Sequence, residues 1–553
     1  MRQKVKKWTI AASLPIVVFV LFAYTNPGER YFEIAKNLDI FATLFKEVNA
    51  YYVDEVNPNT FIKSGIDAML ATLDPYTNYI PEDDIEDYRT MTTNQYGGIG
   101  ALIGRSNNKN LVIMPYEGFP AFEAGLKIGD QLLKVNSVDV ADKNTNEISK
   151  LLKGQASTEV VIQVKRYGID EPISFNLKRE KITIDNVPYF GMVTEDVGYI
   201  KLNDFTTSAG KEVGKAVTRL KEKGAKKVIL DLRQNPGGLL NEAVNVTNIF
   251  IPRGEEIVNT KGKVTDWNKT YKGLNNPVDT EIPLAILTNN RSASASEIVA
   301  GTIQDYDRGV LVGKKTFGKG LVQATRPLSY NSQLKVTTAK YYIPSGRCIQ
   351  AINYSERNED GSVKRIPDSL KVEFKTRNNR TVYDGGGIDP DLSIDYRKLA
   401  PITLSLRGKG LIFDYATKFY YSNDSISSPK EFRLSDDQFD EFLGWLSNKD
   451  YDYVSRVEKT LDELLKLSKE EKYNGTVEST IKDLKKEIRH NKEKDLDKFR
   501  PEIKSILEEE IATRYYFQRG MIEASFNNDP QVLEAVKVLN NEKQYDDILA
   551  LVE

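Results

Sequence analysis

The sequence predicts a multidomain α/β protein with a helical region at each end. The chain has 553 residues, which is room for three or four domains of about 150 residues each. Strand-like apolar runs alternate with helical patterns over residues 187–395, and this alternation is typical of an α/β core. A smaller glycine-rich, strand-rich block covers residues 95–180, whereas helical periodicity dominates residues 30–90 and 400–553. We therefore expect two helical regions, a small β-rich domain and an α/β core.

The N-terminus has the order of a signal sequence. An apolar run from Trp8 to Tyr24 follows four basic residues, namely Arg2, Lys4, Lys6 and Lys7. The run is 17 residues long, which is near the short limit for a helix that spans a bilayer. Its exit, "FAYTNPGER", lacks a small-x-small cleavage site, so residues 1–25 read as an uncleaved signal anchor more readily than as a cleaved signal peptide. Basic residues stay on the cytoplasmic side, so we expect the chain after Asn26 to be exported.

The regions at residues 30–90 and 400–553 are predicted to be helical. In "FEIAKNLDIFATLFKEVNAYYV" and "NTFIKSGIDAMLATL" apolar residues recur at helical spacing, giving two or three helices that end at the turn "DPYT". After about Pro401 the sequence becomes rich in Lys and Glu at i,i+4 spacing. Such charges are typical of solvated helix faces, so we expect a separate C-terminal helical region that carries no chemistry.

The block at residues 95–180 combines the glycine-rich stretch "YGGIGALIG" with strands, a short helix in "PAFEAGL" and a helix in "NTNEISKLLKG". This arrangement resembles a PDZ domain, in which the loop before one strand offers backbone N–H groups to a peptide's terminal carboxylate. The matching peptide-binding residues are Tyr96, Gly97, Gly98, Ile99 and Gly100 of the loop, with Ile148, Leu151 and Leu152 on the groove helix. The alternative is that these apolar residues fill a core, and the four-residue spacing of Ile148 and Leu152 fits either function.

Composition argues against several kinds of partner. The formal net charge of −2 gives no electrostatic reason to expect nucleic acid, because a phosphate-binding surface needs a basic excess. Cys348 is the one cysteine and His490 the one histidine, so the sequence offers neither an internal disulfide nor clustered zinc ligands. We expect no metal and no other cofactor.

The turn "NNRSASASEIVAG" lies between a predicted buried strand and a predicted helix and is dense in serine. A serine at such a turn exposes its hydroxyl, and the helix N-terminus and the following N–H stabilise nearby negative charge. Ser292, Ser294 and Ser296 compete for this role, and at most one of them serves it because they point to different faces. The other interpretation is that the serines cap the helix, with Glu297 in its first turn. The local sequence leaves both interpretations open.

A nucleophilic serine needs a base, and the distant, charged surroundings of His490 argue against a Ser-His-Asp triad. Lys319 lies between glycines in "VGKKTFGKGLVQ". A lysine acts as a general base only where desolvation lowers its pKa. We expect Phe317, Leu321 and Val322 to exclude water around the amine, although a lysine in such a setting is more often a surface residue.

Ordered motifs recur across residues 30–395: "LDPYTNYIPEDDIEDY", the PDZ-like block, "GYIKLNDF", "VILDLRQNPGGLLNEAV", "RSASASEIVAGTIQDYDRGVLVGKKTFGKGLVQ", "YYIPSGRCIQ" and "GGGIDPDL". Together they resemble the C-terminal processing peptidases, also called tail-specific proteases, of the S41 serine-peptidase class. The resemblance implies a ClpP/crotonase-like protease core with an inserted PDZ domain. It also implies that Ser294 is the nucleophile, that Lys319, 25 residues later, is the base, and that Gln323 orients the amine.

The same resemblance implies two oxyanion donors, the N–H of Ala295 and the N–H of Gly237 or Gly238 in "NPGG". The implied function is that of an exported serine endopeptidase that recognises the free C-termini of protein or peptide substrates. We expect it in the periplasm, anchored to the bacterial inner membrane by its N-terminal segment, and self-association through the helical ends fits the resemblance. Cys348 receives no role, and the resemblance is weak after about residue 400.

Two other functions compete with this interpretation. A non-catalytic PDZ scaffold on a degenerate protease core would require loss of the serine, the lysine or the oxyanion glycines, and all of them are present. A different hydrolase, such as an esterase, would use the same Ser/Lys pair, but the tail-binding domain argues against it.

Overall fold

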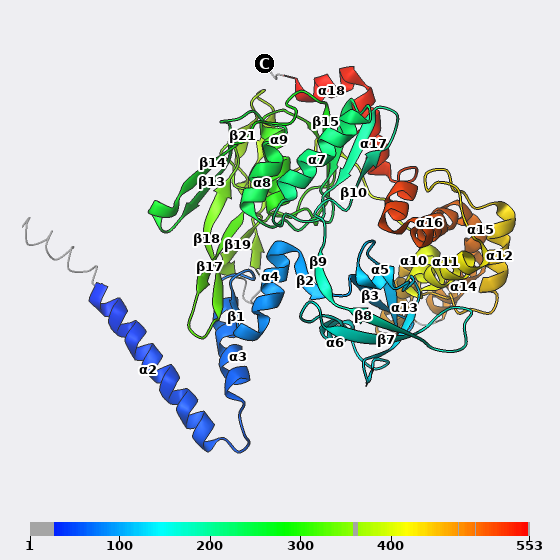
Figure 1. Ribbon diagram of the computed structural model, residues 1–553, viewed down its shortest axis with the longest axis horizontal. Helices are drawn as coiled ribbons and strands as arrows, with labels where there is room; N and C mark the ends of the chain where they lie inside the picture. The colour runs from blue at the N-terminus through cyan, green and yellow to red at the C-terminus, as the bar shows by residue number, and fades with distance from the viewer. Residues whose placement is uncertain (1–26, 358–362, 474, 493, 551–553) are drawn as a thin grey trace, which may run out of the picture. The chain divides into compact units, whose positions relative to one another are not determined.

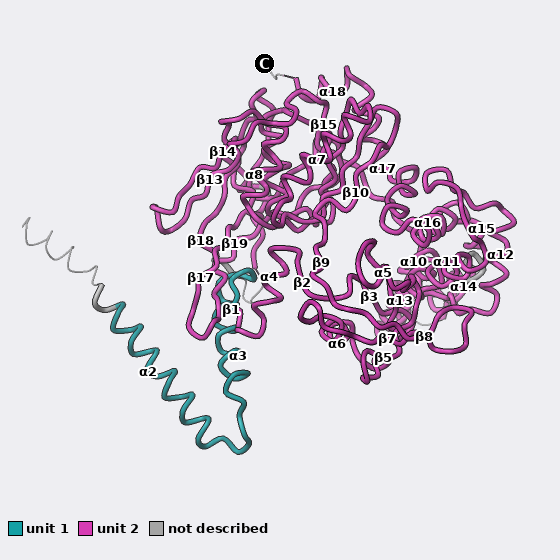
Figure 2. Tube along the Cα trace, in the orientation of Figure 1, with its two compact units in different colours: residues 1–79 teal, residues 80–553 magenta. Residues whose placement is uncertain are grey.

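We describe the fold from a computed structural model, which describes residues 27–357, 363–473, 475–492 and 494–550 (Figure 1). The chain forms two compact units, residues 1–79 and residues 80–553 (Figure 2). The predicted signal anchor at residues 1–25 lies outside the described residues. Among the helices that are described, none combines the length and the apolar character needed to cross a membrane.

The first unit contains the helices α2 (Pro27–Tyr51) and α3 (Pro58–Ala71). The start of α3 follows from its sequence, because the Asn57 side chain accepts hydrogen bonds from the N–H groups of Asn59 and Thr60, both at 3.1 Å. Pro58 then occupies the first turn, where no N–H is needed. The short strand β1 (Asn78–Ile80) follows at the boundary of the two units.

A six-stranded sheet forms the centre of the second unit, in the order β10-β11-β12-β15-β16-β23. β10 is antiparallel to β11, and the other neighbours are parallel. The strands are β10 (Tyr189–Met192), β11 (Val197–Lys201), β12 (Lys227–Asp231), β15 (Leu284–Thr288), β16 (Val310–Gly313) and β23 (Leu392–Ser393). β15 and β16 are buried along their whole length, which explains their continuous apolar sequences.

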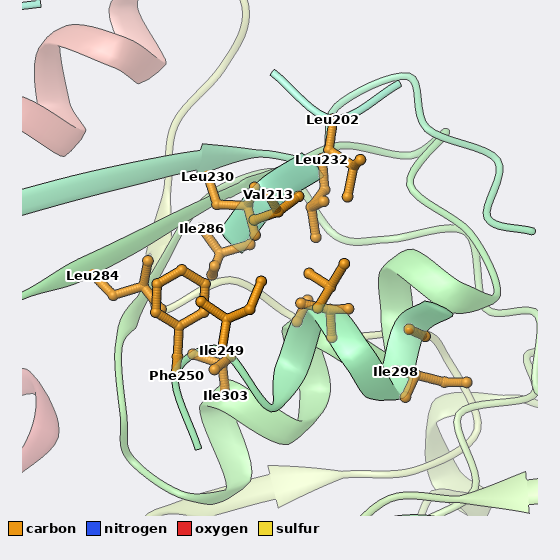
Figure 3. Close-up of a cluster of buried hydrophobic side chains, with 14 of the residues drawn as sticks. Leu202, Val213, Leu230, Leu232, Ile249, Phe250, Leu284, Ile286, Ile298 and Ile303 are labelled. Atoms are coloured by element: carbon orange, nitrogen blue, oxygen red, sulfur yellow. The ribbon is translucent and has the colours of Figure 1, made fainter. Parts of the chain in front are cut away.

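Both faces of this sheet are covered by helices. On one face α7 (Ala209–Glu222), α8 (Leu240–Thr247) and α9 (Ala295–Asp305) pack through side chains such as Val213 and Ile298 into one apolar cluster (Figure 3). On the other face Val532 and Val538 of α17 (Pro530–Asn540) pack against β12, β15 and β16. The sheet therefore lies in the middle of three layers, as expected for an α/β core.

A second sheet contributes the hairpin β17 (Leu321–Pro327) and β18 (Gln333–Tyr342) and the strands β13 (Glu256–Gly262) and β14 (Lys269–Lys272). Short two-stranded pairs complete the core, namely β19 (Ile352–Arg357) with β20 (Val363–Arg365) and β21 (Glu373–Lys375) with β22 (Thr381–Tyr383). Three 3-10 turns span Glu82–Asp84, Thr265–Trp267 and Asp368–Leu370.

The small β-rich domain is a sheet of six strands with two helices. The strands are β3 (Ala101–Ser106), β4 (Lys109–Pro115), β5 (Gln131–Val135), β6 (Val138–Asp139), β7 (Glu159–Lys165) and β8 (Ile173–Lys178). The helices are α5 (Pro120–Glu123) and α6 (Thr145–Leu152). A two-stranded ribbon of β2 (Gln95–Gly98) and β9 (Glu180–Thr183) follows α4 (Ile85–Thr93) and joins this domain to the core.

The C-terminal region is helical and has its own core around Phe439 and Phe442. Its helices, apart from α17, are α10 (Pro401–Gly408), α11 (Leu411–Ser422), α12 (Asp436–Leu446), α13 (Arg456–Glu470), α14 (Thr476–Lys492), α15 (Asp495–Lys498), α16 (Arg500–Ser525) and α18 (Glu542–Leu549). α17 differs from the other helices of the region, because its apolar face is buried against the core sheet.

The helical region also contacts the β-rich domain. The Tyr421 ring stacks on Tyr167 at 5.7 Å between centroids, and Phe517 meets Phe122 edge-on at 5.2 Å. Phe517 interrupts α16 with a positive φ of 51°, so the helix bends where its ring reaches the neighbouring domain. The C-terminal helices thus contact both the β-rich domain and the α/β core.

Candidate active site

A cavity of about 590 Å³ brings together the predicted catalytic residues. It is lined by Ser294, Ala295, Gly237, Gly238, Lys319 and Gln323. Its walls come from α4, from the turn before α8, from the N-terminus of α9 and from the β17–β18 hairpin. Segments that are far apart in the sequence therefore meet at the carboxyl ends of parallel strands, where open α/β sheets bind their ligands.

The structure separates the three serines of the turn. The Ser292 hydroxyl is buried and donates to the Leu232 carbonyl at 2.8 Å. The Ser296 hydroxyl is buried and donates to the Asn235 carbonyl at 2.9 Å. Ser294 lies between them and lines the cavity. Two of the three hydroxyls therefore join the turn to the loop that follows β12, and the middle one faces the space that a substrate needs.

Ser294 has a strained backbone, with φ 55° and ψ −111° immediately before α9. A non-glycine residue in this region costs on the order of 1–3 kcal/mol and persists only where its surroundings enforce it. The flanking hydrogen bonds of Ser292 and Ser296 supply that enforcement.

Glu297 is fully buried and joins the serine turn to the segment that carries Lys319. Its Oε2 accepts from the N–H of Ser294 at 2.9 Å and from the N–H of Lys319 at 2.8 Å. Its Oε1 accepts from the Thr316 hydroxyl at 2.5 Å and from the Gly318 N–H at 2.7 Å. Burial raises the pKa of Glu297 to about 7, and these donors oppose the rise.

Tyr341 forms a second connection between the same two segments. Its buried hydroxyl lies 2.6 Å from the Lys319 carbonyl oxygen and 3.1 Å from the Ser294 carbonyl oxygen. The single hydroxyl proton favours the shorter contact. Neither Glu297 nor Tyr341 was assigned a role from sequence beyond Glu297 as a first-turn capping residue. For Glu297 the available signal was an acidic residue in the first turn of a predicted helix.

The backbone N–H groups beside Ser294 distinguish the two candidate glycines. The Gly237 N–H donates to the Asn235 side chain at 2.9 Å, so it is already engaged. Within the described residues no hydrogen bond is present at the N–H of Gly238 or of Ala295. A Cβ on Gly237 would lie 2.8 Å from the Ala295 nitrogen and 2.8 Å from the Ser294 Cβ. The geometry therefore favours Ala295 and Gly238 as donors, with Gly237 needed for space.

The surroundings of Lys319 differ in part from the prediction. Leu321 is buried and Val322 is half-buried, and both line the same cavity as Lys319. Phe317 does not exclude water there, because its ring is 44% exposed and lines a different cavity. The cause is the direction of the chain, which turns at Gly318 with a φ of 90°. Lys335 of β18 is a second lysine that lines this cavity, and burial lowers its pKa.

Gln323 lies on β17, two residues beyond the start of the strand, and lines the cavity with Lys319. Its Nε2 donates to the Thr337 hydroxyl of β18 at 3.2 Å. This contact holds the side-chain amide in place. That Gln323 orients the amine of Lys319 stays a prediction.

A buried charge network supports the loop that carries Gly237 and Gly238. Asp231, at the end of β12, accepts from Arg233 and from the Tyr199 hydroxyl, and Lys201 lies 3.3 Å away. Burial alone would raise the pKa of Asp231, but the charges of Arg233 and Lys201 outweigh it and hold the pKa well below its usual range. Arg233 also pairs with Asp529 of the helical region at 2.7 Å.

Sequence reasoning missed this network. Charged residues directly after a buried strand in "VILDLRQNPGG" were the available signal for Asp231 and Arg233, because the ends of parallel strands face the ligand site. No local signal pointed to Asp529, which follows Arg233 by almost 300 residues.

In the β-rich domain the expected carboxylate-binding loop is partly a strand. Tyr96, Gly97 and Gly98 pair with β9, and the turn begins at Ile99. A Cβ on Gly97 would lie 2.0 Å from the Gly154 carbonyl, so this glycine permits close packing of two backbones. Ile148 and Leu152 are buried in the domain core together with Ile99. This position agrees with the alternative interpretation, in which these apolar residues fill a core. Gly100 has a φ of 72°, and its carbonyl accepts from the Tyr116 N–H.

No group of three or more His, Cys, Asp and Glu side chains in the described part of the chain is arranged to hold a metal ion. The Cys348 thiol is half-buried, and burial raises its pKa.

Comparisons with known proteins agree with the architecture. Residues 196–355 match the model of peptidase family S41, residues 114–166 match the PDZ domain, and residues 402–539 match the C-terminal helical domain of probable PDZ-proteases. Relatives include a carboxy-terminal-processing protease of Bartonella bacilliformis, 35% identical over 62% of this chain and 78% of the relative. A probable CtpA-like serine protease of Staphylococcus aureus strain MRSA252 is 35% identical over 62% of this chain and 68% of the relative.

Among solved structures, the photosystem II D1 C-terminal processing protease is 26% identical and covers 64% of this chain and 92% of its own, with a TM-score of 0.35. The PDZ domain of a carboxy-terminal protease from Vibrio cholerae in complex with peptide is 25% identical over 16% of this chain and 99% of its own, with a TM-score of 0.16. The predicted fold class, an S41 protease core with a PDZ domain and a C-terminal helical domain, is confirmed. The chain therefore belongs to the S41 family of carboxy-terminal-processing proteases and is a serine-type peptidase.

Proposed function

We propose that the chain is an exported endopeptidase that cleaves protein substrates by Ser/Lys catalysis after recognising their C-terminal tails. The proposal rests on the different surroundings of the three serine hydroxyls in the turn. Ser294 lines the same cavity as Lys319, whereas the Ser292 and Ser296 hydroxyls are engaged elsewhere. Nucleophilic catalysis without histidine requires a hydroxyl and an amine that open into the same cavity.

In this mechanism the Ser294 hydroxyl attacks the scissile carbonyl and the neutral Lys319 amine takes its proton. The N–H groups of Ala295 and Gly238 stabilise the oxyanion. Lys319 as an ammonium then protonates the leaving amine, and the released C-terminal fragment departs. Lys319 next removes a proton from water, which hydrolyses the acyl-enzyme and regenerates Ser294.

The cavity's second lysine gives this mechanism a matched control. Lys319→Arg should be inactive, because a guanidinium stays protonated and accepts no proton from Ser294. Lys335→Arg should keep most of the activity, because Lys335 lies on β18 and the proposed mechanism gives it no proton to transfer. Ser294→Ala should be inactive, and Gln323→Ala should be impaired less than Lys319→Arg. Rates on an unstructured protein with an apolar C-terminus, with circular dichroism to verify folding, test the series. Full activity in folded Lys319→Arg would remove Lys319 as the base.

Tail recognition is proposed for the PDZ domain, and it predicts a dependence on the free carboxylate. Two substrates that differ only in C-terminal amidation should therefore be cleaved at different rates, the free acid faster. Equal rates would remove the tail-binding part of the proposal and leave the Ser/Lys part intact. We also propose a periplasmic location with an N-terminal membrane anchor, which fractionation of cells expressing the full chain tests. Recovery of the protein in the cytosol would contradict it.

A non-catalytic PDZ scaffold is the alternative. It predicts tail binding with no hydrolysis, and the cleavage assay on the parent chain separates the two.

A further inference from the structure

A second cavity, of about 500 Å³, lies beside the segment that precedes Lys319. Three cationic side chains line it, from three different segments: Lys315, Arg365 and Lys371. The exposed Phe317 ring and Asn290 form other parts of its wall. No acidic side chain is among its lining residues in the described part of the chain. The cavity belongs to none of the steps of the proposed mechanism.

Two of the ammonium groups converge on one glycine. A Cβ built on Gly386 would lie 3.0 Å from the Lys371 Nζ and 3.1 Å from the Lys315 Nζ. Any larger residue at this position would displace both amines, so Gly386 leaves the space between them open. Two like charges held this close repel each other, and an anion placed between them removes the repulsion.

The acidic partner of Lys315 competes only weakly with a ligand for the lysine ammonium. Lys315 pairs with Asp389 at 3.0 Å, but the two side chains are 38% and 59% exposed. Solvent screens such a pair, so a ligand inside the cavity can compete for the same ammonium. The neighbouring Lys314 pairs with Asp395 at 2.5 Å and does not line the cavity.

We propose that this cavity binds a multivalent oxyanion, a ligand that carries two or more carboxylate or phosphate groups. Lys315 and Lys371 provide point charges on either side of Gly386. Arg365 provides a planar guanidinium, which binds carboxylate or phosphate through two parallel hydrogen bonds. Cations from three separate segments match a ligand that carries two or more anionic groups.

The position of the cavity connects the ligand to the catalytic segments. The Phe317 N–H donates to the Ser292 carbonyl at 3.0 Å, and the Thr316 hydroxyl donates to Glu297. A ligand that contacts Lys315, Arg365 and Lys371 joins this segment to two others and restricts its motion. Binding therefore stabilises the fold as well as the ligand site.

Titration calorimetry of the full chain with inorganic pyrophosphate at low ionic strength tests the proposal. We expect binding to the parent chain, at least tenfold weaker binding to Arg365→Gln and to Lys371→Met, and parent-like binding to Lys314→Met. Arg365 is exposed, so Arg365→Gln leaves the fold intact. Added pyrophosphate should also raise the Tm of the parent and of Lys314→Met, but not that of Lys371→Met. Absence of binding to the parent, or equal loss in Lys314→Met, would overturn the proposal.

A competition arm distinguishes the two sources of such an anion. A peptide with three consecutive glutamates and its glutamine counterpart are each titrated against bound pyrophosphate, and citrate is titrated as a small carboxylate. Displacement by the acidic peptide assigns the site to acidic segments of a polypeptide, whereas displacement by citrate alone assigns it to a small molecule. If neither competitor displaces pyrophosphate, the carboxylate half of the proposal is wrong. Because the assay measures binding, its result is independent of whether Ser294 and Lys319 perform catalysis.

Discussion

The backbone N–H groups of Ser294 and Lys319 donate to the same oxygen, Oε2 of the buried Glu297. The proposed nucleophile and the proposed base are therefore held by one carboxylate, although 25 residues separate them in the sequence. Any change in that carboxylate acts on both segments at once.

The first prediction concerns the charge of Glu297. Its folded-state pKa, about 7, lies above the ordinary value of 4.5, so the folded protein binds more protons than the unfolded chain between these pH values. The contribution of Glu297 to stability therefore falls as the pH rises through this window, by on the order of 3 kcal/mol in total. Denaturant unfolding of the parent and of Glu297→Gln from pH 4.5 to 7.5 measures it. A difference that stays constant with pH would contradict the prediction.

The second prediction concerns Ser292 and Ser296. Each substitution by alanine removes a buried hydroxyl donor, although the carbonyl that it serves keeps one backbone donor. Ser292→Ala also removes the acceptor of the Asn289 N–H. Each should therefore lower the free energy of unfolding by about 1 kcal/mol. Ser294→Ala removes a hydroxyl that lines the cavity and should change stability less while it abolishes cleavage. Denaturant midpoints and cleavage rates of the three variants give the comparison. Greater loss of stability in Ser294→Ala than in the other two would be inconsistent with the geometry.

The third prediction tests whether Gly237 is needed because it leaves space beside the N–H of Ala295. Gly237→Ala would place a methyl group 2.8 Å from the Ala295 nitrogen, at a φ of 99° that alanine adopts with strain. We expect cleavage to fall by about 10²-fold or more, as for the loss of one oxyanion donor. Gly224→Ala serves as the control, because it also has a positive φ but meets no atom within 4 Å. If the two variants lose activity equally, backbone strain alone is responsible.

The fourth prediction concerns the contact between the helical region and the loop that follows β12. Asp529 pairs with Arg233 and also caps α17 through the N–H groups of Gln531 and Val532. Asp529→Asn keeps a good cap and removes the charge, whereas Asp529→Ala removes both. We expect Asp529→Asn to lower kcat with little change in KM, and Asp529→Ala to cost about 1 kcal/mol of stability in addition. Unchanged kcat in Asp529→Asn would show that the pair has no influence on the site.

The sequence predicted those parts of the site that depend on local pattern. The order of strand, serine turn and helix, and the 25-residue interval to Lys319, are sequence properties, and the cavity contains both residues. The direction of Phe317 was not predictable, because it depends on the turn at Gly318. Tyr96 to Gly98 was expected to be a loop because it is rich in glycine, but β9, more than 80 residues later, supplies its hydrogen bonds. Arg233 and Asp529 meet only in the folded chain.

Because the chain is synthesised from its N-terminus, the Arg233–Asp529 pair can form only after Asp529 has been made. A growing chain contains Ser294 and Lys319 long before it contains Asp529 and α17, which follow by more than 200 residues. Until α17 is made, the face of the core sheet that it covers is exposed and Arg233 lacks one of its carboxylate partners. The loop that follows β12 thus acquires its full set of contacts only after Asp529 and α17 have been made, so a growing chain that already contains Ser294 and Lys319 lacks these contacts for more than 200 further residues.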